Sequence, residues 1–289
     1  MNNGHEVCGV VVEACETTRL RPGDHVGVHE VEGCGDCRYC LRGIPTWCKQ
    51  RRSAVGWRPD GAGGHAEYVK ARERWCFRLP PEIPFPVGAL ITGDGLGVPY
   101  HANRSAGTRA GEIVGVFGTG PIGLGNILMQ SFIGAEVIAV DVNPVRLELA
   151  KACGAALTLD ASRVDVEAAV LEYTRGAGVN KAFECSGTQQ ALLQAMRVVR
   201  PGGCVVCIGE QGDVPIHISE HLIRRDITLR GSWFYHFNEI PDILAAYQRG
   251  LAVERLITNI LPLSKAQEAF DRFFSGLEGK VILAPTRGG

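Results

Sequence analysis

The pattern of hydrophobic and polar positions divides the chain into segments of different kinds. The first, from residue 4 to about residue 95, contains short β-like runs separated by glycine and proline. These runs are VCGVVVEA at 7–14, DHVGVHEV at 24–31 and HAEYVKA at 65–71. Short apolar runs interrupted by turn residues predict a small, irregular β domain.

From about residue 110 the pattern changes to strands that alternate with helix-length segments. The strand–helix pairs are IVGVFG (113–118) with PIGLGNILMQSFIG (121–134), EVIAVD (136–141) with VRLELAKACG (145–154), and KAFECSG (181–187) with QQALLQAMRVV (189–199). A further strand, GGCVVCIG, follows at 202–209. Apolar, β-branched strands joined by helices predict a parallel, doubly wound sheet with right-handed crossovers.

After Gly231 the pattern changes once more. The predicted elements are a helix at 240–250, a strand at 256–263, a second helix at 265–276 and a last strand at 279–285. The chain contains neither an internal repeat nor a low-complexity tract.

Composition narrows the function before any motif is considered. The chain has 289 residues, of which 45% are hydrophobic, and a formal charge of -1, so it can form two domains and offers no large basic surface for nucleic acid. No apolar run approaches the length of a bilayer, and the initial MNNGHEV lacks the basic and apolar regions of a signal peptide. Eleven cysteines, an odd number, fit a reducing compartment better than a disulfide framework. We therefore expect a cytoplasmic protein with neither a nucleic-acid nor a membrane partner.

Four of the cysteines lie within fifteen residues, in CGDCRYCLRGIPTWC. They are Cys34, Cys37, Cys40 and Cys48. Four thiolates at this spacing suit a tetrahedral Zn²⁺ ion that has no open coordination position. The spacing therefore predicts a structural zinc site, which holds a loop together and performs no chemistry.

A glycine-rich turn, GTGPIG, follows the strand at 113–118 directly and precedes a helix directly. This is the context in which three glycines allow a tight turn and let a pyrophosphate approach the helix N-terminus. Asp141 ends the next strand, 23 residues after Gly118, where a carboxylate can accept both hydroxyls of an adenosine ribose. A carboxylate there repels a 2′-phosphate, so NAD is favoured over NADP, although the nearby Arg146 could accommodate a phosphate. The predicted cofactor-binding residues are Gly118, Gly120, Ile122, Gly123, Asp141, Arg146 and Gly209.

Taken together, the motifs resemble those of the zinc-dependent medium-chain alcohol dehydrogenases, and they do so in matching order over the whole chain. They are GHEVCG at 4–9, the four-cysteine loop, GDGLGVPYHA at 93–102, and GTGPIG followed by Asp141. Within that family the chain is most similar to the polyol, threonine and other secondary-alcohol dehydrogenases. The resemblance implies an α/β fold in which a Rossmann doubly wound parallel sheet is inserted into a GroES-like, β-rich catalytic domain. Residues 1–95 and 234–289 would then form the catalytic domain and residues 96–233 the NAD-binding domain.

The resemblance also implies a catalytic zinc ion, whose open position would take the oxygen of a small alcohol substrate while hydride passes to NAD. His5 matches the histidine ligand of the family, and Asp94 falls where the family places its third ligand. Glu6 is a second candidate carboxylate, which binds the metal in some members and lies behind it in others. A homodimer or homotetramer is expected by the same resemblance.

One departure from the family pattern stands at the start of the chain. The first zinc ligand of the family and the neighbouring proton-relay residue lie further upstream than the three residues that precede Gly4. The sequence is therefore expected to be an N-terminally truncated dehydrogenase. Cys8 is the nearest thiol, but it lies within an apolar run and is a poor replacement for the missing ligand.

Three other functions are compatible with parts of the sequence. A truncated chain could bind NAD and zinc without catalysis, and a zinc-free relative could reduce quinones or enones with NADPH, against which the cysteine cluster, His5 and Asp94 argue. A zinc-ribbon module that binds nucleic acid would need basic flanks around the cluster. The flanks instead mix arginine and lysine with Glu30, Glu32 and Asp36.

Overall fold

The computed structural model describes residues 4–51, 55–56 and 63–285. The chain forms two compact units, each with its own contacts. Unit 1 comprises Met1–Gly97, Phe234–Arg272 and Lys280–Gly289, and unit 2 comprises Val98–Trp233 and Phe273–Gly279. The glycine-rich turn and the strand at 202–209 therefore both belong to unit 2. Both ends of the chain contribute to unit 1.

Unit 2 is built on a parallel sheet of six strands in the order β6-β5-β4-β7-β8-β9. Their bounds are β4 Ile113–Phe117, β5 Glu136–Asp141, β6 Leu157–Asp160, β7 Val179–Glu184, β8 Val199–Cys207 and β9 Thr228–Gly231. Numbered within the sheet, this is the order 3-2-1-4-5-6 of a Rossmann domain, and the direction of winding reverses between β4 and β7. The predicted doubly wound α/β fold is confirmed.

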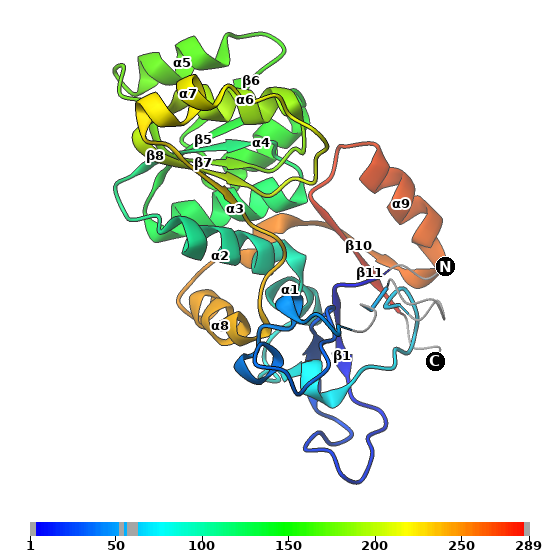
Figure 1. Ribbon diagram of the computed structural model, residues 1–289. Helices are drawn as coiled ribbons and strands as arrows, with labels where there is room; N and C mark the ends of the chain where they lie inside the picture. The colour runs from blue at the N-terminus through cyan, green and yellow to red at the C-terminus, as the bar shows by residue number, and fades with distance from the viewer. Residues whose placement is uncertain (1–3, 52–54, 57–62, 286–289) are drawn as a thin grey trace. The chain divides into compact units, whose positions relative to one another are not determined.

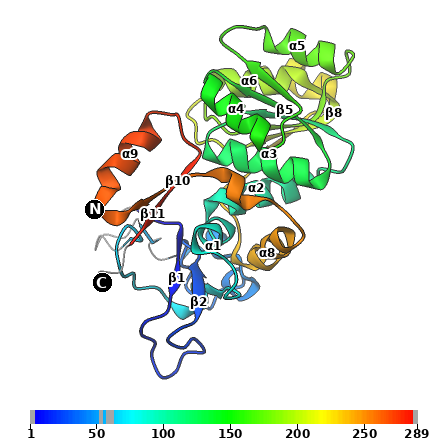
Figure 2. The same cartoon turned by 180° about the vertical axis from the view of Figure 1, so that it is seen from behind.

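Helices cover both faces of this sheet, as the two opposite views in Figures 1 and 2 show. The helices of unit 2 are α3 Pro121–Ile133, α4 Pro144–Ala152, α5 Val166–Tyr173, α6 Gln189–Val198 and the short α7 Ile218–His221. Because parallel crossovers are right-handed, α3 and α4 lie on one face, and α5 and α6 lie on the other after the winding reverses. The helix α2, Asp94–Ala106, begins in unit 1 and continues into unit 2.

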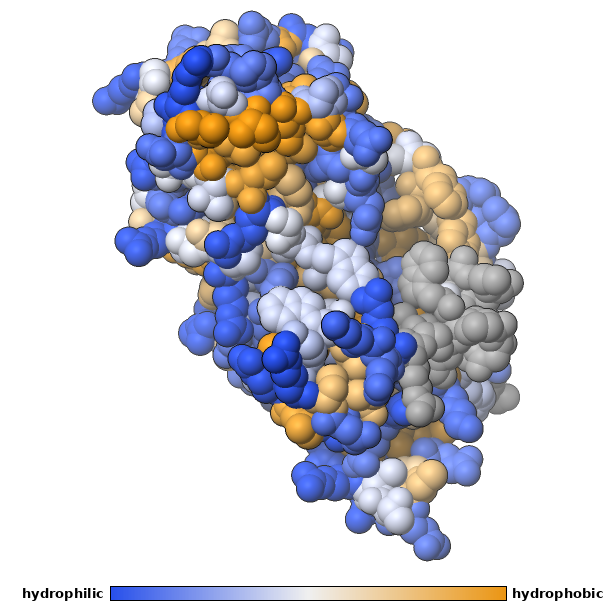
Figure 3. All heavy atoms as spheres, in the orientation of Figure 1, coloured by the Kyte–Doolittle hydropathy of each residue, from blue (hydrophilic) through white to orange (hydrophobic). Residues whose placement is uncertain are grey.

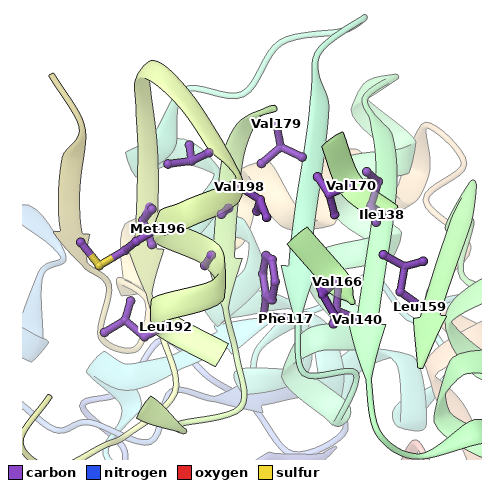
Figure 4. Packing of buried hydrophobic residues seen from close by; sticks show 14 of the residues in the cluster. Phe117, Ile138, Val140, Leu159, Val166, Val170, Val179, Leu192, Met196 and Val198 are labelled. Atoms are coloured by element: carbon purple, nitrogen blue, oxygen red, sulfur yellow. The ribbon is translucent and has the colours of Figure 1, made fainter. Parts of the chain in front are cut away.

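The apolar core of unit 2 lies between the sheet and the helices α5 and α6 (Figure 4). Phe117 and Val179 project from the strands, and Val170 and Met196 pack onto them from the helices. These side chains are at most 1% exposed, so each contributes about 1.5–3 kcal/mol by burial. The continuous apolar strands of the sequence thus reflect a sheet that is buried on both faces.

Unit 1 contains two smaller sheets. An antiparallel sheet joins β1 Val7–Val10, β2 His25–Val28 and β3 Cys76–Arg78 in that order. A parallel pair joins β10 Ile257–Pro262 to β11 Lys280–Ala284. The helices of this unit are α1 Phe85–Ile91, the first turn of α2, α8 Ile240–Gln248 and most of α9 Ala266–Phe274.

The structure departs from the sequence-based expectations in a few elements. Residues 65–71, predicted as a β-like run, form bends and irregular structure, and Tyr68 is 71% exposed. Among the described residues this run is paired with no strand, and β3 completes the small sheet with β1 and β2. The strands β6 and β9 and the helix α5 have no counterpart among the elements predicted from the sequence. Within the described ranges, no helix combines the length and the apolarity needed to cross a membrane.

Candidate metal centres and dinucleotide site

The four cysteines predicted to bind zinc come together in unit 1. Their ligand atoms all lie within 4.8 Å of one another. A tetrahedral zinc ion with Zn–S bonds of about 2.3 Å needs sulfur atoms about 3.8 Å apart. The Sγ atoms of Cys34 and Cys40 are 4.0 Å apart, so the arrangement fits that ion.

The local fold supports a thiolate at Cys34. The backbone N–H of Cys37 donates to Cys34 Sγ at 3.4 Å, and the N–H of Cys34 donates to Cys48 Sγ at 3.4 Å. The backbone amides of Asp36 and Cys37 lower the pKa of Cys34 to about 6. A lowered pKa favours the deprotonated form that binds metal.

The cysteine loop is held by aromatic packing and by the chain that returns at 234–239. Cys40 and Cys48 are buried against Trp75, which contacts the ring of Phe237 edge-on at 5.6 Å. Thr46 Oγ1 and His236 Nδ1 lie 2.7 Å apart. Gly33 is required here because a Cβ at this position would lie 2.3 Å from Cys40 Sγ. The loop is therefore a structural element of unit 1.

A second group of possible metal ligands, again in unit 1, consists of His5, Glu30 and Asp94. His5 Nε2 lies 3.3 Å from Asp94 Oδ2 and 3.7 Å from Glu30 Oε2. A tetrahedral zinc ion with bonds of about 2.0–2.1 Å needs nitrogen and oxygen ligands about 3.3 Å apart. The structure thus brings the predicted pair His5 and Asp94 to ligand spacing, and it adds Glu30 to them. We call these three residues the histidine–carboxylate group.

Burial and neighbouring charges shift the pKa values of residues in this group. Glu30 is 1% exposed, and neither of its carboxylate oxygens has a hydrogen-bond partner in the described part of the chain. Burial, together with the charges of Asp94 and Glu6, raises the pKa of Glu30 far above its usual value. For His5, burial lowers the pKa, but the neighbouring Asp94 and Glu6 outweigh it, so the pKa lies above its usual value. These are the properties of a site that a cation would stabilise.

Glu6, the other predicted carboxylate, has different partners. Its Oε2 accepts a hydrogen bond from the backbone N–H of Gly95 at 2.9 Å, and its Oε1 pairs with the ammonium group of Lys280. It therefore lies beside the histidine–carboxylate group and outside it. Cys8 also lies apart, because its Sγ packs against Gly88 of α1 and burial raises its pKa to about 12.

Glu30 was not predicted as a ligand from the sequence, in which it stands among the acidic flanks of the cysteine cluster. The sequence offered no signal that separates Glu30 from its neighbours. Residues 26–33 are all buried, Glu32 among them, so their position in an apolar run does not single out Glu30.

The dinucleotide turn in unit 2 has the geometry that its glycines predict. Gly118 has a φ of +89°, and a Cβ there would lie 2.7 Å from the backbone nitrogen of Ser186. A Cβ at Gly123 would lie 1.9 Å from the carbonyl oxygen of Gly118. At Gly120, by contrast, a Cβ would meet no atom within 4 Å, so its neighbourhood is open. Tight packing therefore requires the first and third glycines, and the middle one leaves room for a ligand.

Asp141 lies beside this turn, at the end of β5. Its Oδ2 accepts hydrogen bonds from the backbone N–H and the hydroxyl of Thr119 at 2.6 and 2.9 Å. Its Oδ1 accepts from the N–H groups of Val142 and Asn143 at 2.8 and 2.9 Å. These bonds hold the carboxylate next to the turn. A ribose hydroxyl that bonds to Asp141 would take the place of the Thr119 hydroxyl, because a carboxylate has about four acceptor positions.

The loop containing Gly209 lies at the same edge of the sheet. Glu184, fully buried at the end of β7, accepts from the N–H groups of Ser186 and Gly187 at 2.7 and 2.9 Å and from Gln211 Nε2 at 3.1 Å. The backbone N–H of Gly209 donates to the carbonyl oxygen of Glu184 at 3.0 Å. The loops after β4, β7 and β8 are thus joined at the carboxyl ends of the strands, where such sheets bind ligands.

Comparison with known proteins finds families and relatives that are zinc-type dehydrogenases. The family described as "Alcohol dehydrogenase GroES-like domain" matches residues 1–81, and the family described as "Zinc-binding dehydrogenase" matches residues 121–249. An uncharacterized zinc-type alcohol dehydrogenase-like protein of Escherichia coli, YphC, is 33% identical over 97% of this chain and 80% of its own length. Sorbitol dehydrogenase of Ovis aries is 31% identical over 97% of this chain and 79% of its own length.

A solved structure agrees with this. Alcohol dehydrogenase TADH from Thermus sp. ATN1 superposes with a TM-score of 0.90 at 29% identity, over 98% of this chain and 84% of that one. The matches span both units, and the two metal-ligand groups and the dinucleotide turn lie within the chain that they cover. The chain therefore belongs to the zinc-dependent medium-chain alcohol dehydrogenases, a family of oxidoreductases that use zinc and NAD.

Proposed function

We propose that this chain oxidises a secondary alcohol or a polyol to the corresponding carbonyl compound, with NAD as the hydride acceptor. The contact between His5 and Asp94 carries the proposal most directly. The two residues are far apart in the sequence, were predicted as ligands of one metal ion, and lie 3.3 Å apart in a partly buried, acidic site. We also propose that residues 1–95 and 234–289 form the catalytic domain and residues 96–233 the NAD-binding domain.

In this proposal His5 and Asp94 hold a zinc ion, and Glu6 stands behind them. A zinc ion in such a site supplies a Lewis acid that lowers the pKa of a substrate hydroxyl. Asp94 is fixed at the first residue of α2 by its two glycine neighbours, since a Cβ at Gly93 would lie 2.4 Å from the Ala89 carbonyl oxygen. Glu6 accepts the Gly95 amide and so fixes the same turn from the other side.

The residues of unit 2 would bind and orient NAD. The proposed set is Gly118, Gly120, Ile122, Gly123, Asp141, Arg146 and Gly209. Asp141 favours NAD, because its carboxylate would repel the 2′-phosphate of NADP. Arg146 follows Asp141 on α4, and an exchange of Asp141 for a neutral residue would let this guanidinium attract that phosphate.

The substrate class rests on the ligand types and on the relatives. An acid in place of a third cysteine ligand, and similarity to a sorbitol dehydrogenase, both favour secondary alcohols and polyols. We place the enzyme in the cytoplasm on the basis of its cysteine content.

The experiment is to incubate purified, zinc-loaded protein with NAD and a panel of primary, secondary and polyhydric alcohols while NADH is followed at its absorption band. The proposal expects turnover of a secondary alcohol or polyol, a preference for NAD over NADP, and a loss of about 10³-fold in kcat/KM for His5→Ala. Binding of NAD without turnover of any alcohol would favour a non-catalytic zinc- and NAD-binding protein. Reduction of quinones with NADPH would favour the zinc-free reductase.

We further propose that two copies of the chain pair through unit 2. In the described part of the sheet, β9 is an edge strand with β8 on one side only. Beside it, Ile218 and Ile223 are 53% and 64% exposed, and Figure 3 shows an apolar patch over α7. An open strand edge next to an apolar patch is suited to pairing with a second copy. Light scattering should give at least a dimer, and Ile223→Lys should shift it toward the monomer; a monomeric wild-type protein would contradict this.

A further inference from the structure

We propose that Glu30 is a direct ligand of the metal ion held by His5 and Asp94, so that the described residues contribute one imidazole and two carboxylates to the centre. This inference rests on the metal centre of the proposed function, but it does not require that the chain oxidises an alcohol.

The first argument is the position of the Glu30 side chain. Its carboxylate is 2% exposed and points to His5, whose Nε2 lies 3.7 Å from Glu30 Oε2. All three ligand atoms of the group lie within 4.8 Å of one another. A cation placed among these three ligand atoms could be coordinated by all of them without a change of fold.

The second argument is the lack of partners. Both oxygens of Glu30 and one oxygen of Asp94 are buried without a hydrogen-bond donor among the described residues. Buried carboxylates are normally hydrogen-bonded or paired, since an unpaired charge in a protein interior is strongly unfavourable. A metal ion would satisfy these oxygens at once.

The third argument is the contrast with the neighbouring acidic residue. Glu6 is paired with Lys280 and accepts the Gly95 amide, so its charge is compensated within the protein. Among the described residues, the cation-forming side chain within reach of both Glu30 and Asp94 is His5. The two carboxylates carry a charge of about −2 when ionised, which a divalent cation neutralises.

The backbone explains how Glu30 reaches this place. Gly27 of β2 packs directly onto Thr92, because a Cβ at Gly27 would lie 1.9 Å from Thr92 Oγ1. This close approach brings the end of β2 to the turn that carries Asp94. The backbone N–H of Val55 donates to the Glu30 carbonyl oxygen at 2.9 Å and fixes the chain after the strand.

A consequence follows for the two metal centres of the chain. The histidine–carboxylate group offers nitrogen and oxygen donors, whereas the cysteine cluster offers four thiolates. Thiolate sites hold zinc tightly, and oxygen-rich sites are less selective for it. A competing chelator should therefore empty the histidine–carboxylate group first and leave the cluster filled.

The test uses the metal alone, without alcohol or NAD. The wild-type protein is loaded with zinc, treated with a chelator until about one zinc per chain remains, and refilled with Co²⁺. Wild-type protein is expected to take up about one Co²⁺ per chain, and Glu30→Gln should bind it at least about 100-fold more weakly. In Glu30→Cys, the bound Co²⁺ should gain a thiolate-to-cobalt charge-transfer band, which appears only when the side chain at position 30 binds the metal directly.

Glu239→Gln is the matched control. Glu239 is also a glutamate of unit 1 that is 1% exposed, but its carboxylate accepts a hydrogen bond from the His236 amide at 2.8 Å. Its substitution should lower stability and leave Co²⁺ uptake unchanged. In metal-free protein, Glu30→Gln should raise the thermal midpoint because it removes an unsatisfied buried carboxylate, which also shows that the variant folds.

The outcomes separate the two proposals. Equal Co²⁺ affinity in wild type and Glu30→Gln, or a Glu30→Cys protein without the charge-transfer band, would overturn the ligand role of Glu30 and leave the proposed function intact. Metal binding that depends on Glu30, in a protein that oxidises no alcohol of the panel, would support the ligand role and overturn the proposed function.

Discussion

Lys280 and Glu6 form an ion pair that joins the two ends of the chain, although 274 residues separate them. Lys280 begins β11, and Glu6 immediately precedes β1. The pair is largely buried, with 14% and 18% of the two side chains exposed. It ties the C-terminal strand pair of unit 1 to the segment that carries His5, and it gives Glu6 a partner other than the metal.

Breaking this pair should destabilise unit 1. We expect Lys280→Met to lower the free energy of unfolding by about 2 kcal/mol, because it leaves Glu6 buried and unpaired. Lys280→Met combined with Glu6→Gln should recover part of this loss. Urea unfolding of the wild-type protein and of the two variants measures both effects.

An exposed ion pair provides the comparison for that prediction. Arg272 and Glu268 lie 2.9 Å apart on α9, but 44% and 39% of their side chains are exposed. Arg272→Met should therefore cost less than about 1 kcal/mol. If Lys280→Met and Arg272→Met lowered the free energy of unfolding by equal amounts, burial of the Lys280 pair would not strengthen its contribution to stability.

Two glycines of the dinucleotide turn should respond differently to alanine. Gly123→Ala should unfold at a lower temperature, since the new Cβ would lie 1.9 Å from the Gly118 carbonyl oxygen. Gly120→Ala should keep the wild-type midpoint, because no atom lies within 4 Å of its Cβ and its φ of −65° suits any residue. It should nevertheless weaken NAD binding by about 10-fold or more, since the open space is where a pyrophosphate approaches.

Thermal unfolding and NAD titration of both variants test this difference. Full NAD affinity in a stable Gly120→Ala protein would show that the cofactor does not approach the turn at this position. A Gly123→Ala protein of unchanged stability would contradict the packing argument.

Zinc should protect the four cysteines of the cluster from thiol reagents. The chain has eleven cysteines and, among the described residues, no disulfide, so the unfolded, metal-free protein should react at every thiol. In folded, zinc-loaded protein the exposed Cys15 should react quickly, and Cys34, Cys37, Cys40 and Cys48 should not.

Chelation should expose the cluster, and mass spectrometry can locate the modified residues. Cys34 and Cys37 should be modified first, because they are less buried than Cys40 and Cys48 and their pKa values are lowered. Rapid labelling of Cys34 in zinc-loaded protein would contradict the assignment of the cluster as a closed zinc site.

The turn before β2 should make stability depend on acid. Asp24 accepts a hydrogen bond from the Arg21 amide at 2.7 Å and pairs with Arg78 at 2.7 Å, and these partners lower its pKa below the usual 3.8. A lowered carboxyl pKa adds stability above the pKa of the unfolded chain, and this stability is lost as the pH falls through the folded value.

Asp24→Asn should therefore unfold at a lower temperature than wild type at neutral pH. The difference should shrink once the pH falls below about 4, where the unfolded carboxyl is protonated. Melting curves between neutral pH and about pH 3 measure it. A difference that stayed constant over this range would show that the charge of Asp24 contributes nothing.

The sequence by itself determined the features that depend on neighbouring residues. GTGPIG specifies its own turn, because positive φ and close packing demand glycine at Gly118 and Gly123 whatever surrounds them. The cysteine spacing likewise specifies a compact thiolate cluster, and β-branched runs separated by helices specify a parallel sheet. The fold class was therefore predictable before any contact was known.

Only the tertiary structure decided how the acidic residues of unit 1 are used. Glu6, Glu30 and Asp94 look alike in the sequence, and nothing near Glu30 marks it as different from Glu32. The approach of β2 to Thr92 brings Glu30 to Asp94, and the strand β11 brings Lys280 to Glu6. Whether a carboxylate faces a cation or stands alone depends on such long-range packing, so the composition of the histidine–carboxylate group could not be read from the chain.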